Sequence, residues 1–398
     1  MLARRVSLAS TLVIALAAAG CAEEPDPAPT GEPNPYQEVV DQGAARYLGK
    51  TKVTEETTDD TGVTTYTFDP ASGPVCLKGE PYRMSVRDTG SDDLFLFLQG
   101  GGACWSTFCL AINEAQEGIP ANLDILNPDK PTNPVAGWST VFFPYCDGSL
   151  FSGDADHDDD GDGELDRQQR GLANLSAGLD IAAKRFPTPK RIVLAGSSGG
   201  GYGTLLATLL VRTRFPTADL LVFNDAGVGI AQPGQEAFIT GLLDEWNART
   251  LMPESCDGCT ATGHITRLVD WQLERDPHLQ VAVFSSYRDY VVSEVFLEIG
   301  GDAFESALIE ETGVVHAAWP DRYRRFFVKG NVHTTLLGGL EGLVGSNFGA
   351  VTYPPDIAEK LGDIQLGGID TVQQNGLTTA TWFRAMIEGG PEWEDRLE

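Results

Sequence analysis

The sequence predicts an α/β protein with a mostly parallel central sheet flanked by helices. From about residue 37 onward, short apolar runs typical of strands alternate with longer helical patterns, and no internal repeat interrupts them. This alternation is the pattern of a parallel sheet whose crossover connections are helices. The chain has 398 residues, 42% of them apolar, which is enough to bury one large core. We therefore expect a single domain over residues 37–398.

The individual elements follow from apolar periodicity. Gly171–Phe186 places Leu172, Leu175 and Leu179 on one face, as an amphipathic helix does. The other expected helices are Tyr202–Thr213, Gln235–Asn247 and Ile265–Arg275. The expected strands are Leu94–Leu98, Ser139–Tyr145, Arg191–Ala195, Asp219–Phe223, Gln280–Ser285 and Arg325–Val328. Leu336–Leu377 is rich in glycine and predicts irregular structure.

The charge balance limits the partners of this chain. Its 57 acidic residues outnumber 28 basic ones, and the formal net charge is -29. Such a surface repels the phosphates of nucleic acids and anionic membranes. We expect no nucleic-acid partner.

The first residues predict export. Arg4 and Arg5 precede a short apolar segment, Leu8–Ala19, as in a signal peptide over residues 1–20. Leu16–Cys21 resembles a bacterial lipoprotein cleavage site, which predicts a lipid on Cys21; a plain secretory signal is the alternative. Residues 21–36, acidic and rich in proline, predict a tether. We expect a lipoprotein that faces the periplasm or cell surface and meets the membrane only through its anchor, or else a secreted protein.

The remaining cysteines fit an oxidising compartment. After Cys21 there are six: Cys76, Cys104, Cys109, Cys146, Cys256 and Cys259. An even number in an exported chain favours disulfides. The spacing of Cys256 and Cys259 also suits a redox or metal half-site, but no second pair or histidine cluster completes a metal site.

A glycine-rich turn carries the strongest chemical signal. Gly196-Ser-Ser-Gly-Gly200 follows an expected strand and opens an expected helix, and read in register it is G-x-S-x-G. This motif places a nucleophilic serine on a sharp turn above a helix N-terminus. We assign the nucleophile to Ser198, because Ser197 would put Ala195 at the first small position. A phosphate-binding loop is the alternative, but the lysine that it needs is missing.

A nucleophilic serine needs a histidine base and an acid that orients it. Where the serine lies on such a turn, the acid and then the histidine follow it in the chain. His333 comes directly after the strand at 325–328 and is our candidate base; His316 lies before that strand. Asp289 follows the strand at 280–285 and is our candidate acid. Asp225 is its rival, for which we expect a structural or pocket-shaping role.

The oxyanion that forms during acyl transfer needs backbone N–H donors. Gln99-Gly-Gly-Gly-Ala-Cys104 follows an early strand and suits one donor, because glycine lets the backbone come close to a substrate. Gly199, directly after Ser198, suits the other donor.

Four segments together resemble the pectin acetylesterase/Notum family of serine carboxylesterases. They are Phe97–Trp105, Pro144–Gly153, Arg170–Asn174 and Ala195–Gly200. The resemblance implies an α/β-hydrolase fold, carboxylesterase activity and no required cofactor. By position it implies the triad Ser198, Asp289 and His333. It further implies the oxyanion donors Gly101, Gly102 and Gly199, and disulfides Cys76–Cys146 and Cys104–Cys109, with Cys256–Cys259 as a local addition.

An acidic run near the Pro144–Gly153 segment predicts a structural calcium ion. Asp156, Asp158, Asp160 and Glu164 occupy positions 1, 3, 5 and 9 of a calcium-binding loop. Position 12 is Arg167 where an acid is usual, so a solvated acidic loop is the alternative.

These observations predict an exported serine esterase that removes acetyl or other short acyl groups from a carbohydrate or small ester. Because the net charge of -29 would repel polyanionic pectin, a neutral glycan or soluble ester competes as substrate. An acyltransferase and a lipoprotein that only binds a ligand are the alternatives on the same fold.

Overall fold

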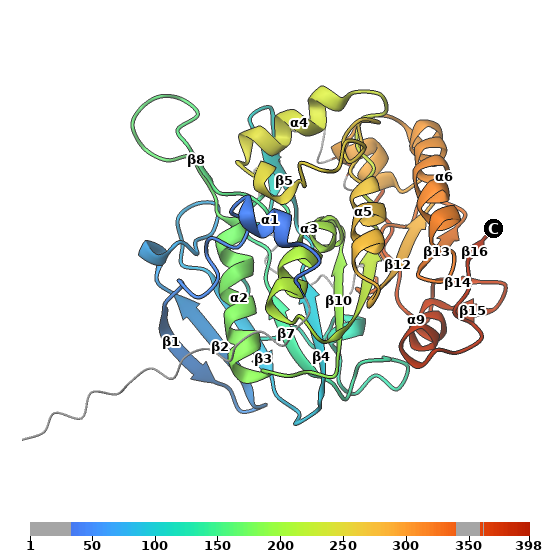
Figure 1. Cartoon of the computed structure of the whole chain (residues 1–398), viewed down its shortest axis with the longest axis horizontal. Helices are drawn as coiled ribbons and strands as arrows, with labels where there is room; N and C mark the ends of the chain where they lie inside the picture. The colour runs from blue at the N-terminus through green and yellow to red at the C-terminus, as the bar shows by residue number, and fades with distance from the viewer. Residues whose placement is uncertain (1–32, 340–358, 361) are drawn as a thin grey trace, which may run out of the picture. The chain divides into compact units, whose positions relative to one another are not determined.

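The computed structural model describes residues 33–339, 359–360 and 362–398 (Figure 1). Within it, Asn34–Glu398 form one compact unit. The expected signal peptide, Cys21 and nearly all of the tether lie outside the described residues. No helix in the described ranges is long and apolar enough to cross a membrane.

The central sheet carries the site. Its strands are β1 (Val53–Thr58), β2 (Val63–Phe68), β3 (Arg83–Arg87), β4 (Asp93–Leu98), β7 (Ser139–Phe143), β10 (Arg191–Ser197), β11 (Asp219–Asp225), β12 (Leu279–Ser286), β13 (Tyr323–Val328) and β16 (Arg396–Leu397). Short two-stranded pairs are β5 (Gly102–Trp105) with β6 (Phe108–Ala111), β8 (Ala155–His157) with β9 (Arg167–Gln169), and β14 (Gln373–Gln374) with β15 (Leu377–Thr378).

The helices are α1 (Gln37–Asp41), α2 (Gly171–Arg185), α3 (Gly199–Arg214), α4 (Glu236–Glu245), α5 (Arg267–Arg275), α6 (Gly301–Ala318) and α9 (Thr379–Glu388). A π-helical turn covers Val291–Phe296. Each expected helix and strand is confirmed, with boundaries that shift by a few residues.

The described strands pair in the order β1-β2-β3-β7-β4-β10-β11-β12-β13-β16. From β7 to β16 neighbours pair parallel, whereas β1, β2 and β3 extend the sheet antiparallel. This mostly parallel sheet with flanking helices is the architecture that the sequence predicts. Parallel strands bring their carboxyl ends to one edge, where the candidate residues lie.

Both faces of the sheet are buried, which explains why its strands are continuous apolar runs. Leu94, Leu96 and Leu98 of β4 belong to a core cluster that also holds leucines of α2 and α3. Phe95 and Phe97 point to the opposite face and pack in a second cluster with side chains of α9. Figure 1 shows α2 and α3 lying in front of the sheet.

The longer elements that the sequence did not predict include β1–β3, α6 and α9, and for β1 and α6 the physical reason is clear. All six residues of β1 are exposed, and they are mainly threonine and glutamate, so that strand has no apolar run. On α6, Ile309 and Val314 are 49% and 43% exposed, which blurs the apolar stripe of an amphipathic helix.

The six described cysteines form three disulfides: Cys76–Cys146, Cys104–Cys109 and Cys256–Cys259. These are the pairs that the family resemblance implies. The last of them excludes the metal half-site as the state of Cys256 and Cys259 in this structure.

Candidate active site

Ser198 lies on a strained turn between β10 and α3. Its φ is 56° and its ψ is -121°, a backbone conformation that residues other than glycine seldom adopt. The chain is very crowded here: a Cβ on Gly196 would lie 2.3 Å from the carbonyl oxygen of Gly200. A Cβ on Gly200 would lie 2.1 Å from the carbonyl oxygen of Leu98. The glycines of the motif are thus required by the close approach of three backbone segments.

The two adjacent serines have different surroundings. Ser197 is fully buried, and its hydroxyl donates to Oδ2 of Asp225 at 2.7 Å. Ser198 is partly exposed and lines a cavity, while its backbone N–H donates to the carbonyl oxygen of Asp225 at 2.8 Å. Of the two hydroxyls, the one on Ser198 is therefore placed where a substrate can reach it.

His333 and Asp289 meet although 44 residues separate them. Nδ1 of His333 lies 2.9 Å from Oδ1 and 2.8 Å from Oδ2 of Asp289. Asp289 is fully buried, and its Oδ1 also accepts from the N–H of Val292 at 3.1 Å. A carboxylate at Nδ1 favours the tautomer with the proton on that nitrogen. Nε2 is then left with a free lone pair, as a general base needs.

Nε2 of His333 is buried and has no hydrogen-bond partner among the described residues, Ser198 included. The structure therefore brings the acid and the histidine together but shows no bond from the histidine to the serine. Catalytic hydrogen bonds are often long without substrate.

The rival residues have other partners. The Asp225 carboxylate accepts from Ser197 and from the backbone N–H groups of Thr335 and Leu336. His316, on α6, has its Nδ1 2.8 Å from the carbonyl oxygen of Tyr323. Neither residue contacts His333 through a hydrogen bond.

The glycine run after β4 lies against the serine turn. A Cβ on Gly199 would lie 2.8 Å from the carbonyl oxygen of Gly102, so the two backbones touch. Gly102 and Gly199 line the same cavity as Ser198, whereas Gly101 faces the side chains of Tyr145 and Ile112. The positions of Gly102 and Gly199 suit two donors toward one oxyanion.

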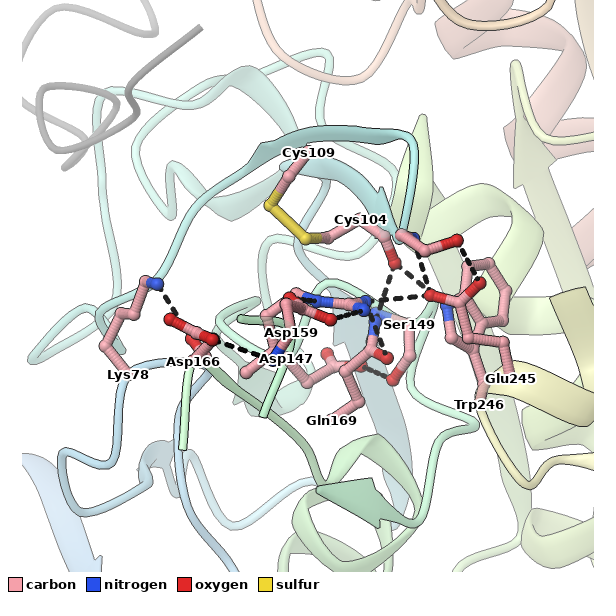
Figure 2. Close-up of a disulfide and its surroundings, with 12 residues drawn as sticks. Lys78, Cys104, Cys109, Asp147, Ser149, Asp159, Asp166, Gln169, Glu245 and Trp246 are labelled. Atoms are coloured by element: carbon pink, nitrogen blue, oxygen red, sulfur yellow. Dashed lines mark hydrogen bonds and ion pairs between the residues drawn. A yellow bond between two sulfur atoms is a disulfide. The ribbon is translucent and has the colours of Figure 1, made fainter. Parts of the chain in front are cut away.

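The hairpin β5–β6, which begins at Gly102, is held from outside (Figure 2). The carbonyl oxygen of Cys104 accepts from Nε2 of Gln169 at 2.6 Å and from the indole N–H of Trp246 at 2.9 Å. The Glu245 carboxylate accepts from the N–H and the hydroxyl of Ser106 at 2.6 and 3.0 Å. The end of α4 is thus joined to the hairpin that bears Gly102.

Arg167 extends this connection to the acidic loop. It pairs with Glu245 at 2.9 Å and with Asp159 at 2.7 Å. The Arg167 side chain is only 5% exposed, while that of Asp159 is 42% exposed. The pair therefore joins a buried guanidinium to a carboxylate in water.

The cavity beside Ser198 is apolar and has a volume of about 90 Å³. Aromatic side chains on its wall are Trp105, Tyr202, Phe238, Trp246 and Phe296. Aliphatic side chains also line it: Ala103, Leu150, Leu206, Ile230, Ala231, Ile239, Leu242, Leu243, Ile265, Val291, Val292 and Leu297. Its lining contains no charged side chain, so it suits a small hydrocarbon group. Sequence analysis assigned none of these residues to a site; the apolar face of the expected helix at 235–247 was the available signal.

Comparison with protein families gives the site a context. The family model described as Pectinacetylesterase matches residues 55–256, just over half of the chain. The chain belongs to the pectin acetylesterase family. The matched range includes Gly102, Ser198 and Gly199 but ends before Asp289 and His333. Assignment of the acid and the base thus depends on the structure and on the resemblance at those positions.

Curated members of the family are distant relatives. The chain is 26% identical over 172 residues to pectin acetylesterase 7 of Arabidopsis thaliana. It is 24% identical over 222 residues to palmitoleoyl-protein carboxylesterase notum2 of Xenopus laevis. These matches cover 39% and 46% of the chain, and the chain spans 43% and 42% of the length of these relatives.

The acidic loop groups a different set of carboxylates from the one expected for calcium. Ligand oxygens of Asp158, Asp160 and Asp166 lie within 4.8 Å of one another. Asp156 instead forms an ion pair with Arg170, and Glu164 is not in the group. Asp166 was missed because the twelve-residue loop pattern does not include its position.

Proposed function

We propose that this protein is an exported serine carboxylic-ester hydrolase that removes short acyl groups from a carbohydrate or a small ester. The observation that carries the proposal is the hydrogen-bonded pair of His333 and Asp289 at the same sheet edge as the strained Ser198. Family membership supports ester hydrolysis, and the three disulfides support export to an oxidising compartment. Lipidation of Cys21 is a further part of this proposal.

The first half of the reaction forms an acyl-enzyme. Nε2 of His333 takes the hydroxyl proton of Ser198 as Oγ bonds to the ester carbonyl carbon. The carbonyl oxygen becomes an oxyanion, which accepts hydrogen bonds from the N–H groups of Gly102 and Gly199. The bond to the alkoxy group then breaks, and His333 gives that oxygen its proton, so the alcohol leaves.

Water completes the cycle. His333 takes a proton from the water as its oxygen bonds to the acyl carbon, and the same proton returns to Oγ of Ser198 when the carboxylic acid leaves. Asp289 keeps the imidazole in one orientation and stabilises its cationic form.

The cavity limits the acyl group. Its volume of about 90 Å³ is smaller than the roughly 150 Å³ apolar cavity that takes up benzene. We therefore propose acyl chains from two to about four carbons. The name of the Arabidopsis relative, pectin acetylesterase 7, suggests acetylated carbohydrate as the ester. A net charge of -29 favours a neutral glycan or a soluble ester over a polyanion.

A structural calcium ion on the acidic loop is a separate proposal. Oxygen ligands of Asp158, Asp160 and Asp166 suit a hard cation, and Asp156 is already paired with Arg170. Calcium addition after chelation should raise the melting temperature of the wild type and not that of Asp160→Asn. If calcium changes the melting temperature of the wild type and of Asp160→Asn by the same amount, or changes neither, the loop does not bind a structural calcium ion.

The test of ester hydrolysis is a panel of p-nitrophenyl esters with acyl chains from two to sixteen carbons. We expect the highest kcat/KM at the short end. Ser198→Ala should lower kcat by about 10⁵- to 10⁶-fold. The adjacent Ser197→Ala is the matched comparison, and its kcat should fall by no more than about tenfold. Activity that survives Ser198→Ala and disappears in Ser197→Ala would reverse the assignment of the nucleophile.

A further inference from the structure

Asp225 is a buried carboxylate between the two catalytic segments. It is the last residue of β11, and in the sheet register it stands opposite Ser197 of β10 and Phe284 of β12. It is fully buried. The reaction described above does not use it.

One side of Asp225 holds the serine turn. Its Oδ2 accepts from the hydroxyl of Ser197 at 2.7 Å, and its backbone carbonyl oxygen accepts from the N–H of Ser198 at 2.8 Å. Two bonds from one residue therefore fix both residues of the strained Ser197–Ser198 step.

The other side of Asp225 holds the histidine loop. Its Oδ1 accepts from the N–H of Thr335 at 2.8 Å, and its Oδ2 accepts from the N–H of Leu336 at 3.0 Å. Thr335 comes two residues after His333. The intervening Thr334 has a φ of 68°, so the loop turns sharply between the imidazole and these bonds.

We propose that Asp225 is a positioning residue, which joins the Ser198 turn to the His333 loop and sets their separation for proton transfer. This inference rests on the proposed function, since it concerns the alignment of that same serine and histidine. The four bonds leave little freedom for either segment to move without the other. A displacement of about 1 Å at such a site costs roughly 100-fold in rate.

The charge of Asp225 supports this role. Burial raises the pKa of Asp225 to about 6, while its hydrogen bonds and the charge on His333 act in the opposite direction. An ionised Asp225 also stabilises the positive charge that His333 gains when it takes a proton from Ser198. The groups that face His333 in this way are Asp289, from the turn after β12, and Asp225, from the end of β11.

Asp225→Asn is the principal test. It places an amide N–H₂ among groups that are all donors, and it removes the charge. We expect kcat to fall by about 100-fold with little change in KM. Because the pKa of Asp225 is raised to about 6, loss of its charge below that pH should form part of the acid limb of the wild-type kcat/KM profile, and Asp225→Asn should lack that part. A purely structural role would lower activity and stability and leave that limb unmoved.

Ser197→Ala is a second test of the positioning role of Asp225, and it can be used even if Asp225→Asn does not fold. It removes one of the four bonds and keeps the charge. We expect kcat to fall by about 2- to 10-fold with an unmoved acid limb. The rate at which a fluorophosphonate labels Ser198 should fall in parallel.

The outcomes separate this inference from the proposed function. Ester hydrolysis by the wild type and none by Ser198→Ala would establish the function. With that result, an unchanged kcat and acid limb in Asp225→Asn, or an unchanged kcat in Ser197→Ala, would overturn the role of Asp225 alone.

Discussion

The sheet edge that carries Ser198, Asp289 and His333 differs from the cavity wall formed by the β5–β6 hairpin and α4. At the sheet edge, the polar contacts are buried: Ser197, Asp225 and Asp289 have no exposed surface. At the wall, the bonds from Gln169 and Trp246 to Cys104 are buried, but the ion pair behind them reaches water through the 42% exposed Asp159. The serine turn depends on close backbone contacts and buried hydrogen bonds, whereas the wall consists of apolar side chains with a partly exposed ion pair behind them.

This difference teaches where the protein tolerates change. A buried donor or acceptor that loses its partner costs the full desolvation energy. A partly exposed ion pair contributes little, because water and salt compensate for it. Changes at the sheet edge should therefore remove catalysis, whereas changes at the wall should mainly alter which acyl group is accepted.

After Ser198→Ala, the largest effect at the sheet edge is expected for a substitution of Asp289. Asp289→Asn leaves the shape intact but favours the wrong imidazole tautomer of His333, and kcat should fall by about 10⁴-fold. Steady-state kinetics on acetyl and butyryl esters measures this. A loss of less than tenfold in a folded variant would mean that Asp289 does not orient His333.

The next effect tests the contact between the two regions. Gly199→Ala places a Cβ 2.8 Å from the carbonyl oxygen of Gly102, which should push the two oxyanion donors apart. We expect kcat to fall by about 100-fold. Gly241→Ala on α4, whose Cβ would meet nothing within 4 Å, is the control and should match the wild type. Equal kcat for all three proteins would remove Gly199 from the oxyanion site.

The pH dependence of stability reports on the buried edge. Because burial raises the pKa of Asp225 to about 6, the folded protein keeps a proton there that the unfolded chain, with a pKa of about 3.9, releases. The stabilisation from this proton is present at low pH and is lost as the pH rises through about 6. From about pH 4 to about pH 8, the wild type should lose roughly 2 kcal/mol of unfolding free energy relative to Asp225→Asn. Urea denaturation of both proteins at several pH values measures the difference in unfolding free energy. A difference that does not change with pH would contradict the raised pKa of Asp225.

At the wall, specificity should change more than rate. Leu242→Trp fills part of the cavity and should lower kcat/KM for butyryl esters by about tenfold while acetyl esters are spared. Leu242→Ala enlarges the cavity and should move the optimum to longer chains. The ester panel measures both effects. If the two variants show the same dependence of kcat/KM on acyl-chain length, the acyl group does not bind in this cavity.

The smallest effect is expected for the ion pair behind the hairpin. Glu245→Gln weakens the connection to Arg167 and should lower the free energy of unfolding by about 1 kcal/mol. The deficit should shrink at high salt, where the wild-type pair is screened. A deficit that does not depend on salt would assign the effect to packing of α4.

The serine turn could be predicted from the sequence because its constraints are local. Gly196 is required by the close approach of β10 and α3, and Gly200 by the approach of β4 to the same turn, so both constraints fall on positions within one short motif. Asp289 and His333 could be proposed as a pair because each follows an apolar strand and parallel strands end at the same edge, and the structure brings the two together. The disulfide pairs came from the family resemblance.

The other features depend on contacts between distant segments. The cavity wall combines Trp105, Phe238 and Phe296, which no local pattern connects. Asp225 was expected to have a structural or pocket-shaping role, but its bonds to Ser197 and Thr335 depend on strand register and on a loop 110 residues away. Asp166 joins Asp158 and Asp160 only because β8 and β9 pair and close the acidic loop.

Covalent labelling of Ser198 tests the central claim most directly. Folded wild-type protein would be treated with a fluorophosphonate and digested, and its peptides analysed by mass spectrometry. The account predicts one adduct, on Ser198, that persists in Ser197→Ala, disappears in Ser198→Ala and forms much more slowly in His333→Ala. No adduct in folded wild-type protein, or an adduct on another residue, would contradict it.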